Sequence, residues 1–175
     1  AGRRIDIQDL MVMALSASTF EQALVMIAEV YRAAGELMAQ RGGLQGVADE
    51  GGWWPAFGSN EEALEILTRA IEHAGYQPVD EVGISLDIAA SEFGKAGRYR
   101  FGLEAREFDS LEMAETLIDW CNRYPIVSVE DPLAVRVDLV AAAAAGHSYG
   151  LARLRELPLI HARRPDAGDG RRLRE

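Results

Sequence analysis

Hydrophobic residues recur at helical spacing in three segments of the chain. The first begins at the Ser-Thr-Phe-Glu sequence of residues 18–21, which is a capping box, and it ends at Gly42 and Gly43. We expect a helix there, with one apolar stripe facing the core. The residues of that stripe are Phe20, Leu24, Ile27, Tyr31, Ala34 and Met38.

Two further segments follow the same pattern. One begins at Ser59 and closes at Gly75, and the other runs from about Ser110 to Arg123. Apolar positions three and four residues apart predict that both are amphipathic helices. The expected inward positions are Leu64, Leu67, Ile71 and Ala74 in the first helix, and Leu111, Ala114, Ile118 and Cys121 in the second.

Short apolar runs between these segments predict strands over residues 5–13, 82–89 and 126–130, the last of which is stopped by Pro132. Residues 97–101 are expected to form part of a short hairpin before the third helix. Strands that alternate with helices are typical of βα units. The predicted fold class is therefore α/β, with a parallel sheet or a β/α barrel.

Two of the predicted strands share a pattern of serine, apolar residue and carboxylate. Ser85 and Asp87 lie on one face of the first strand, and Ser128 and Glu130 lie on one face of the second. Since β/α barrels build their active sites at the C-terminal ends of strands, two acids at such ends favour a site for a hard divalent metal such as Mg²⁺. The alternative is that both are ordinary acids that cap nearby loops.

Residues 47–57, with the sequence VADEGGWWPAF, place acids and glycines directly before aromatic rings. Glycine allows backbone conformations that are closed to other residues and lets the chain approach a ligand closely. Aromatic neighbours exclude water, which raises the pKa of a carboxyl group toward values useful in acid–base catalysis. This segment therefore indicates either a catalytic turn around Glu50 or a surface turn with a small hydrophobic cluster.

The charge of the chain is unevenly distributed. Residues 1–135 hold 10 basic and 23 acidic residues, a net charge of −13, whereas residues 136–175 hold 8 and 5, a net charge of +3. An acidic main body argues against nucleic acid as a partner and suits a protein that gathers cations. The single Cys121 excludes a disulfide framework and fits a reducing cytoplasm, and no apolar run reaches the roughly 18 residues of a membrane span.

Five segments resemble the enolases in order and spacing. They are IQDLMVM (7–13), ADEGGWWPAF (48–57), EEALEILTRAIEHAGY (61–76), SLDIAASEF (85–93) and YPIVSVEDPLA (124–134). Of these, SLDIAASEF and the VSVEDP sequence are highly specific to that family. The resemblance covers residues 1–134 and implies roughly the first half of an enolase-type β/α (TIM-like) barrel. Residues 135–175 are expected to form a divergent, Arg/Ala-rich tail outside the family pattern.

The resemblance implies a glycolytic lyase that interconverts 2-phosphoglycerate and phosphoenolpyruvate with Mg²⁺ as its cofactor. Glu50 matches the general acid, Asp87 and Glu130 match two of three metal-binding carboxylates, and Gln8 matches a substrate contact. Asp9 stands beside that Gln where most enolases have Glu, so it keeps the charge on a shorter side chain. The implied partners are a small phosphorylated substrate and, since enolases are homodimers, a second copy of the chain; the implied location is the cytoplasm.

The chemistry of this reaction explains why such residues are needed. Removal of the proton alpha to a carboxylate gives a highly charged enolate, which metal ions neutralise while an acid protonates the departing hydroxide. Trp53, Trp54 and Phe57 are expected to wall in Glu50 and keep it protonated. The glycines at positions 51–52 are expected to let this turn move over the substrate.

The match to the family ends near Ala134. The family continues with a third metal-binding Asp and with lysines, one of which is the catalytic base, whereas Lys95, in a turn, is the only lysine of this chain. Other candidates lack the strand context of a ligand and resemble tail residues: Asp138, Asp166, Asp169, His147 and His161. In the tail we expect short helices at 136–146 and 150–157 and disorder at 162–175.

Two interpretations of function remain open from the sequence. The first is an enolase-family lyase, or a piece of one. The second is a catalytically inactive, truncated remnant that acts only as a binding or oligomer-forming surface, because an incomplete barrel leaves open sheet edges and exposed apolar faces. The abrupt change of composition after residue 134 also indicates either a frameshift in the underlying gene or a chimeric gene prediction.

Overall fold

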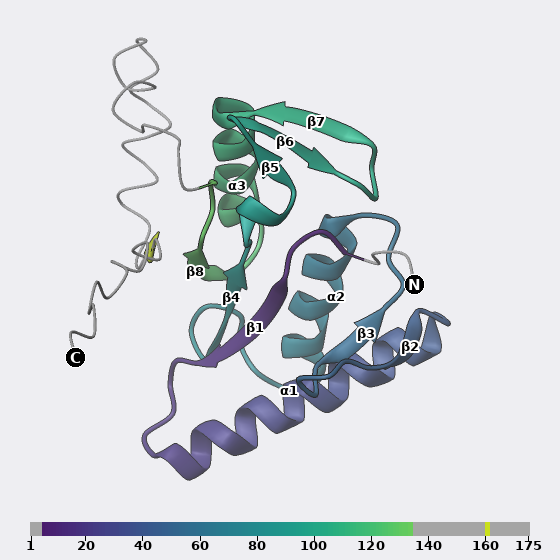
Figure 1. Cartoon of the computed structure of the whole chain (residues 1–175). Coiled ribbons are helices and arrows are strands. Elements are labelled where there is room, and N and C mark those ends of the chain that lie inside the picture. Colours follow the sequence, from purple (N-terminus) through teal and green to yellow (C-terminus); the bar gives the residue numbers. More distant parts are fainter. Residues whose placement is uncertain (1–4, 135–159, 162–175) are drawn as a thin grey trace, which may run out of the picture.

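The computed structural model describes residues 5–134 and 160–161. Its helices are α1 (Phe20–Gln40), α2 (Asn60–His73) and α3 (Ser110–Arg123), with a short 3-10 turn η1 (Ala90–Glu92). Figure 1 shows α1 crossing beside α2, and α2 contacts β4 while α3 contacts β8. The three predicted helices are therefore confirmed, and they cover the sheet as in an α/β fold.

The main sheet has the strand order β1 (Asp9–Ala14), β4 (Val82–Asp87), β8 (Ile126–Glu130) and β9 (Ile160–His161). β4, β8 and β9 run parallel, but β1 runs antiparallel to β4. The prediction of an entirely parallel arrangement was therefore wrong for β1, which is joined to β4 through two helices, α1 and α2, and not through the single helix of a βαβ unit. Within the described residues these strands form an open sheet rather than a closed barrel.

Two smaller sheets complete the described structure. β2 (Leu44–Val47) and β3 (Trp53–Pro55) form an antiparallel hairpin that the sequence analysis did not predict. β5 (Gly94–Lys95), β6 (Arg98–Phe101) and β7 (Arg106–Asp109) form a three-stranded antiparallel sheet. This second sheet confirms the predicted hairpin before α3 and extends it by a strand. The strand β9, which carries His161, was not predicted either.

Helix α1 differs from the prediction in its cap and in its buried face. Thr19, not Ser18, is the N-cap, because its hydroxyl oxygen accepts the Gln22 backbone N–H at 3.1 Å. The expected stripe fails in the first half of the helix, where Phe20 and Leu24 are 74% and 51% exposed. Among the described residues, little covers this half of α1, so apolar spacing alone selected the wrong face. The buried residues of α1 are Met26, Val30, Ala33, Ala34, Gly35, Leu37 and Met38.

Helices α2 and α3 follow their predicted boundaries. Ser59 caps α2 by accepting the Glu62 backbone N–H at 3.2 Å, and Leu64 and Ile71 are buried as expected. In α3 the capping box is formed by Asp109 and Glu112. The expected inward residues of α3 were partly wrong, since Leu111, Ile118 and Cys121 are only half-buried. The buried residues of α3 are Met113, Ala114, Leu117 and Trp120.

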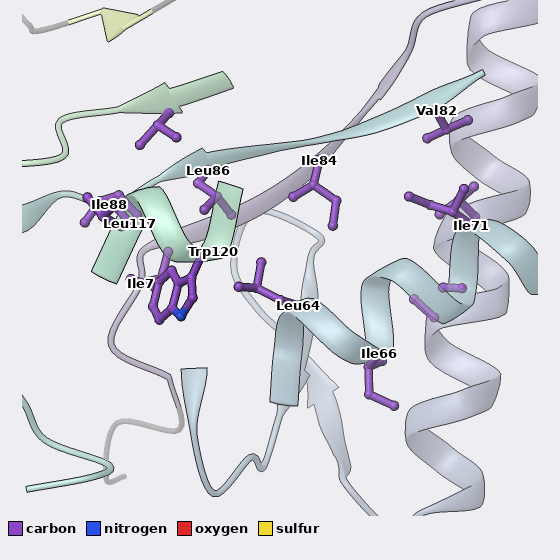
Figure 2. Close-up of a cluster of buried hydrophobic side chains, with 14 of the residues drawn as sticks. Ile7, Leu64, Ile66, Ile71, Val82, Ile84, Leu86, Ile88, Leu117 and Trp120 are labelled. Atoms are coloured by element: carbon purple, nitrogen blue, oxygen red, sulfur yellow. The ribbon is translucent and has the colours of Figure 1, made fainter. Parts of the chain in front are cut away.

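The hydrophobic core lies between β4 and the helices. Figure 2 shows Ile84 and Leu86 of β4 pointing toward Leu64 of α2, with Leu117 and Trp120 of α3 close to Ile88. These β4 side chains are at most 1% exposed. A strand buried to this extent is rigid, and its C-terminal end therefore gives a fixed support for Asp87.

A buried polar cluster joins three parts of the chain near the start of β1. The Asp6 carboxylate, 6% exposed as a residue, accepts the backbone N–H of Gly102 at 2.9 Å and the side-chain N–H of Asn60 at 3.1 Å. The side-chain oxygen of Asn60 in turn accepts the Asp6 backbone N–H at 2.9 Å. The cluster therefore ties the segment before β1 to the start of α2 and to the turn after β6.

The described residues include no helix that is both long and apolar enough to cross a membrane. The helices predicted at 136–146 and 150–157, and the disorder predicted at 162–175, lie outside the described residues. Most of the predicted tail, 135–175, therefore remains a prediction.

Candidate active site

The two carboxylates singled out in the sequence lie side by side on parallel strands. Asp87 of β4 is paired with Glu130 of β8, and Ser85 with Ser128. A register shift in this pairing, between Ile84 and Ser85, brings the two runs of serine, apolar residue and acid into alignment. Directly paired residues of neighbouring strands point to the same face of the sheet. The two acids therefore lie on the same face of the sheet, as their spacing predicts, and their role as metal ligands stays a prediction.

A third carboxylate belongs to the same row. In the antiparallel pairing of β1 with β4, Asp9 lies opposite Asp87. Because β1 runs in the reverse direction, its first residues reach the edge of the sheet where β4 and β8 end. Gln8, just ahead of β1, places its side-chain nitrogen 3.5 Å from Asp87 Oδ2, at the outer limit of a hydrogen bond. Gln8, Asp9, Asp87 and Glu130 are thus gathered at one rim.

Backbone hydrogen bonds hold together the ends of β4 and β8. The Ile88 N–H donates to the Glu130 carbonyl at 3.0 Å, and the Ala90 N–H donates to the Asp131 carbonyl at 3.1 Å. Ala89 and Asp131 both adopt left-handed backbone conformations, with φ of 46° and 43°. Such conformations are uncommon for residues other than glycine and cluster at functional sites. The rim is therefore a fixed, locally strained part of the fold.

Asp87 occupies an environment that disfavours its charge. The residue is 8% exposed, and its Oδ1 accepts the Ala89 backbone N–H at 3.1 Å. Burial raises the pKa of Asp87, and the nearby carboxylate of Glu130 raises it further; Asp131 and Asp9 add smaller increases, and the Ala89 hydrogen bond offsets only part of the total. A cation placed among these carboxylates would relieve their repulsion and favour the ionised form of Asp87.

The donor set matches a magnesium ion only in part. Across residues 5–134, no three acidic, histidine or cysteine side chains lie close enough together to hold a metal ion. Two carboxylates can nevertheless bind Mg²⁺, which keeps several waters and takes its other ligands from substrate oxygens. Asp131, which influences the pKa of Asp87, is a further acid that the sequence analysis missed, although it directly follows Glu130 in the VSVEDP motif.

Glu50 lies apart from this row, in the turn of the β2–β3 hairpin. The Gly51 N–H donates to the Ala48 carbonyl at 2.9 Å and the Ala48 N–H donates to the Gly52 carbonyl at 2.8 Å, which closes the turn around Asp49 and Glu50. Gly51 has a φ of 87°, a conformation that favours glycine. The expected backbone role of this glycine is therefore supported.

The expected aromatic wall around Glu50 was wrong. Glu50 is exposed, and Trp53 stacks instead on Tyr31 of α1, with ring centroids 4.4 Å apart. Trp54 is 41% exposed. The sequence places these rings next to Glu50, but β-strand geometry sends successive side chains to opposite faces, and α1 offers an apolar surface for Trp53.

A cavity of about 510 Å³ lies between β1 and the helices α1 and α2. Gln8 and Asp9 line one side of it, and Gly52 and Trp53 line the other. Most of the remaining lining is apolar and comes from α1, α2 and β1. Gly52 of the Glu50 turn and Asp9 of the acidic row therefore border the same space, whereas Glu50, Asp87 and Glu130 are not among its lining residues.

Comparison with known proteins agrees with this geometry. The family model described as "Enolase, C-terminal TIM barrel domain" matches residues 1–143. The protein named Enolase 1 of Desulfitobacterium hafniense (strain Y51) is 46% identical over 133 residues, which is 74% of this chain and 30% of that protein. The chain thus spans less than a third of the length of this curated relative. With a family match over most of its length and acids at the ends of two parallel barrel strands, the chain belongs to the enolase family.

Proposed function

We propose that this chain contributes the acidic side of an enolase-type lyase site, which in the complete enzyme dehydrates 2-phosphoglycerate reversibly to phosphoenolpyruvate. The observation that carries the proposal is the alignment of Asp87 with Glu130, with Asp9 opposite Asp87. Family membership and the named relative support the same reaction. The proposed substrate is a small phosphorylated acid, and the proposed location is the cytoplasm.

Each residue has a defined role in this proposal. Asp87 and Glu130 hold Mg²⁺, which when bound neutralises negative charge on the substrate. Gln8 and Asp9 border the cavity and orient the substrate through a side-chain amide and a carboxylate. Glu50 donates its proton to the departing hydroxide, which leaves as water.

The reaction also needs a base that removes the proton alpha to the substrate carboxylate. Lys95 is the only lysine of the sequence, and it is exposed on β5. It is therefore not assigned as the base. Because no other lysine is present, we expect the isolated chain to bind Mg²⁺ and substrate without turning the substrate over.

Titration calorimetry tests the metal site directly. Mg²⁺ is added to the chain in the presence and absence of 2-phosphoglycerate, and the same titration is repeated with Asp87→Asn and Glu130→Gln. We expect binding by the native chain, with a loss of at least tenfold in affinity in each variant. Asp80→Asn, which changes an exposed acid, is the matched control and should bind like the native chain. Equal binding by all four proteins would refute the assignment of these ligands.

A second measurement tests Glu50. Glu50→Gln should keep Mg²⁺ binding nearly unchanged, because Glu50 lies in a different sheet from Asp87 and Glu130. In a preparation that eliminates water from 2-phosphoglycerate, the same change should abolish elimination. Full turnover by the variant would show that Glu50 is not the general acid.

The alternative function is a binding or oligomer-forming surface without catalysis. It is favoured by Met11, Met13 and Leu15, which are 37–42% exposed along β1, at the edge of the main sheet. Binding of Mg²⁺ separates the two functions, since the isolated chain is expected to bind the ion without hydrating phosphoenolpyruvate, whereas a surface for association needs no ion. Concentration-dependent association together with no Mg²⁺ binding would support the surface function and contradict the lyase site.

A further inference from the structure

The turn that carries Glu50 is fastened to α1 by a set of contacts from Tyr31 and Trp53. The rings of these residues stack with an interplanar angle of 15°. The Trp53 indole N–H donates to the backbone carbonyl of Tyr31 at 2.7 Å, and the Tyr31 hydroxyl donates to the carbonyl of Gly51 at 2.8 Å. Tyr31 and Trp53 therefore stack on each other, and each donates a hydrogen bond to the backbone of the segment that carries the other ring.

Gly35 makes this arrangement possible. A Cβ atom at Gly35 would lie 2.6 Å from Cζ2 and 2.7 Å from Cε2 of Trp53, which is far inside van der Waals contact. Glycine in the interior of a helix costs about 1 kcal/mol relative to alanine. Helix α1 thus carries an unfavourable residue at the one place where the indole ring lies against its backbone.

The hydroxyl bond acts on the residue next to Glu50. Gly51 is held from inside the turn by its N–H bond to Ala48 and from outside by the Tyr31 hydroxyl on its carbonyl. Glu50 lies between these anchored residues, so the direction of its Cα–Cβ bond is set by both. Its side chain is exposed and is not confined by packing. The backbone is therefore the main means by which the fold can orient this carboxyl group.

We propose that Tyr31, Gly35 and Trp53 form a latch that fixes the Glu50 turn against α1, which makes Tyr31 a positioning residue for Glu50. The proposal that the latch serves catalysis rests on the proposed role of Glu50 as general acid. The existence of the latch itself does not depend on that role. Its action is local: the latch orders residues 48–52 without contributing to the main sheet.

The test uses the 175-residue chain and measures amide hydrogen exchange and backbone order by NMR. Tyr31→Phe keeps the stacked ring and removes only the hydroxyl. A net hydrogen bond between neutral groups corresponds to roughly a threefold to tenfold change in an opening equilibrium. We therefore expect exchange at the Gly51 amide to accelerate by about that factor, and the order parameter of the Glu50 amide to fall.

Gly35→Ala independently tests the packing of the Trp53 ring against the backbone of α1. The added methyl group displaces Trp53, so exchange of the indole N–H should accelerate at least tenfold, and the Glu50 order parameter should fall below its value in Tyr31→Phe. Tyr76→Phe is the matched control for the first variant, because Tyr76 also makes a hydroxyl bond to α1, at Glu29. Gly58→Ala is the control for the second, because a Cβ there meets its nearest atom only at 3.7 Å.

The outcomes separate the latch from the function. Faster exchange at the turn in both variants, with no change in the controls or at the Ile84 amide, supports the latch. Unchanged exchange and order at residues 50–51 in Tyr31→Phe would overturn it, and so would an equal change in Tyr76→Phe. These measurements need neither Mg²⁺ nor substrate. A failure of Mg²⁺ binding or of elimination would therefore refute the proposed function while leaving the latch intact.

Discussion

Replacing Asp6 by alanine removes the acceptor at the centre of the buried polar cluster. The Asp6 carboxylate accepts the Gly102 N–H at 2.9 Å, the Asn60 side-chain N–H at 3.1 Å and the Leu103 N–H at 3.4 Å. Asn60 is 1% exposed, so water cannot readily replace the lost acceptor at its side chain. The variant therefore leaves the buried Asn60 side-chain N–H without a partner, whereas the exposed Gly102 can exchange the carboxylate for water.

The expected cost follows from the two well-formed bonds. A hydrogen bond to a charged group contributes about 1.5–3 kcal/mol, and the bond at 3.4 Å adds little. Removal of the buried charge returns part of that energy, because the carboxylate no longer has to be desolvated. We therefore expect Asp6→Ala to lower the free energy of unfolding by about 3 kcal/mol, a large share of the roughly 5–15 kcal/mol typical of a domain.

Urea denaturation followed by far-ultraviolet circular dichroism measures this change. The midpoint should fall at an unchanged slope if the folded structure is otherwise kept. Asp80→Ala is the control, since Asp80 is exposed, and it should stay within about 0.5 kcal/mol of the native chain. A loss below about 1 kcal/mol in Asp6→Ala would show that the cluster does not hold the start of β1, and the reasoning from its bonds would be wrong.

Three further predictions concern other parts of the chain. In urea titrations at pH 7.5, Asp87→Asn should have a higher free energy of unfolding than the native chain, because burial and Glu130 raise the pKa of Asp87 and so disfavour its charged form in the folded state. The native chain becomes less stable as pH rises through this raised pKa, so the difference between the two proteins should vanish near the ordinary pKa of about 3.9. Leu64→Ala should lower the free energy of unfolding by about 2–5 kcal/mol, but Leu24→Ala by less than about 1 kcal/mol, because Leu64 is 1% exposed and Leu24 is 51% exposed. Equal losses of stability in thermal melts of the two variants would contradict this difference in burial. Burial raises the pKa of Cys121 to about 11, so Ellman's reagent should label it slowly at pH 8 and rapidly in urea; fast labelling of the folded chain would contradict its burial.

The acidic rim could be predicted from the sequence because strand geometry is regular. Side chains alternate with a period of two, and parallel strands end at the same edge, so equal spacing of serine and acid indicated a shared face for Asp87 and Glu130, although it did not indicate the register shift that pairs them. Helix boundaries were predicted for a similar reason, since caps such as Ser59 act locally. Both predictions start from patterns between residues close in sequence, namely the period of two within each strand and the local cap of each helix.

Features that depend on distant partners could not be predicted in this way. The spacing of apolar residues in α1 permits more than one buried face, and contact with α2 and β1 decides between them. The same holds for Trp53, whose neighbour in sequence is Glu50 but whose neighbour in space is Tyr31. The direction of β1 relative to β4 likewise depends on how α1 and α2 pack against each other in the connection between the two strands.

The reversed direction of β1 determines where a reporter group can be attached. The chain leaves this strand at Ala14, whereas Gln8 and Asp9 lie at its other end. A strand of six residues spans roughly 17–20 Å, so the exposed Ser16 is well removed from the acids. A fluorophore or an immobilisation tag inserted after Ser16 would therefore leave the rim accessible, whereas the same insertion after Asp87 or Glu130 would obstruct it.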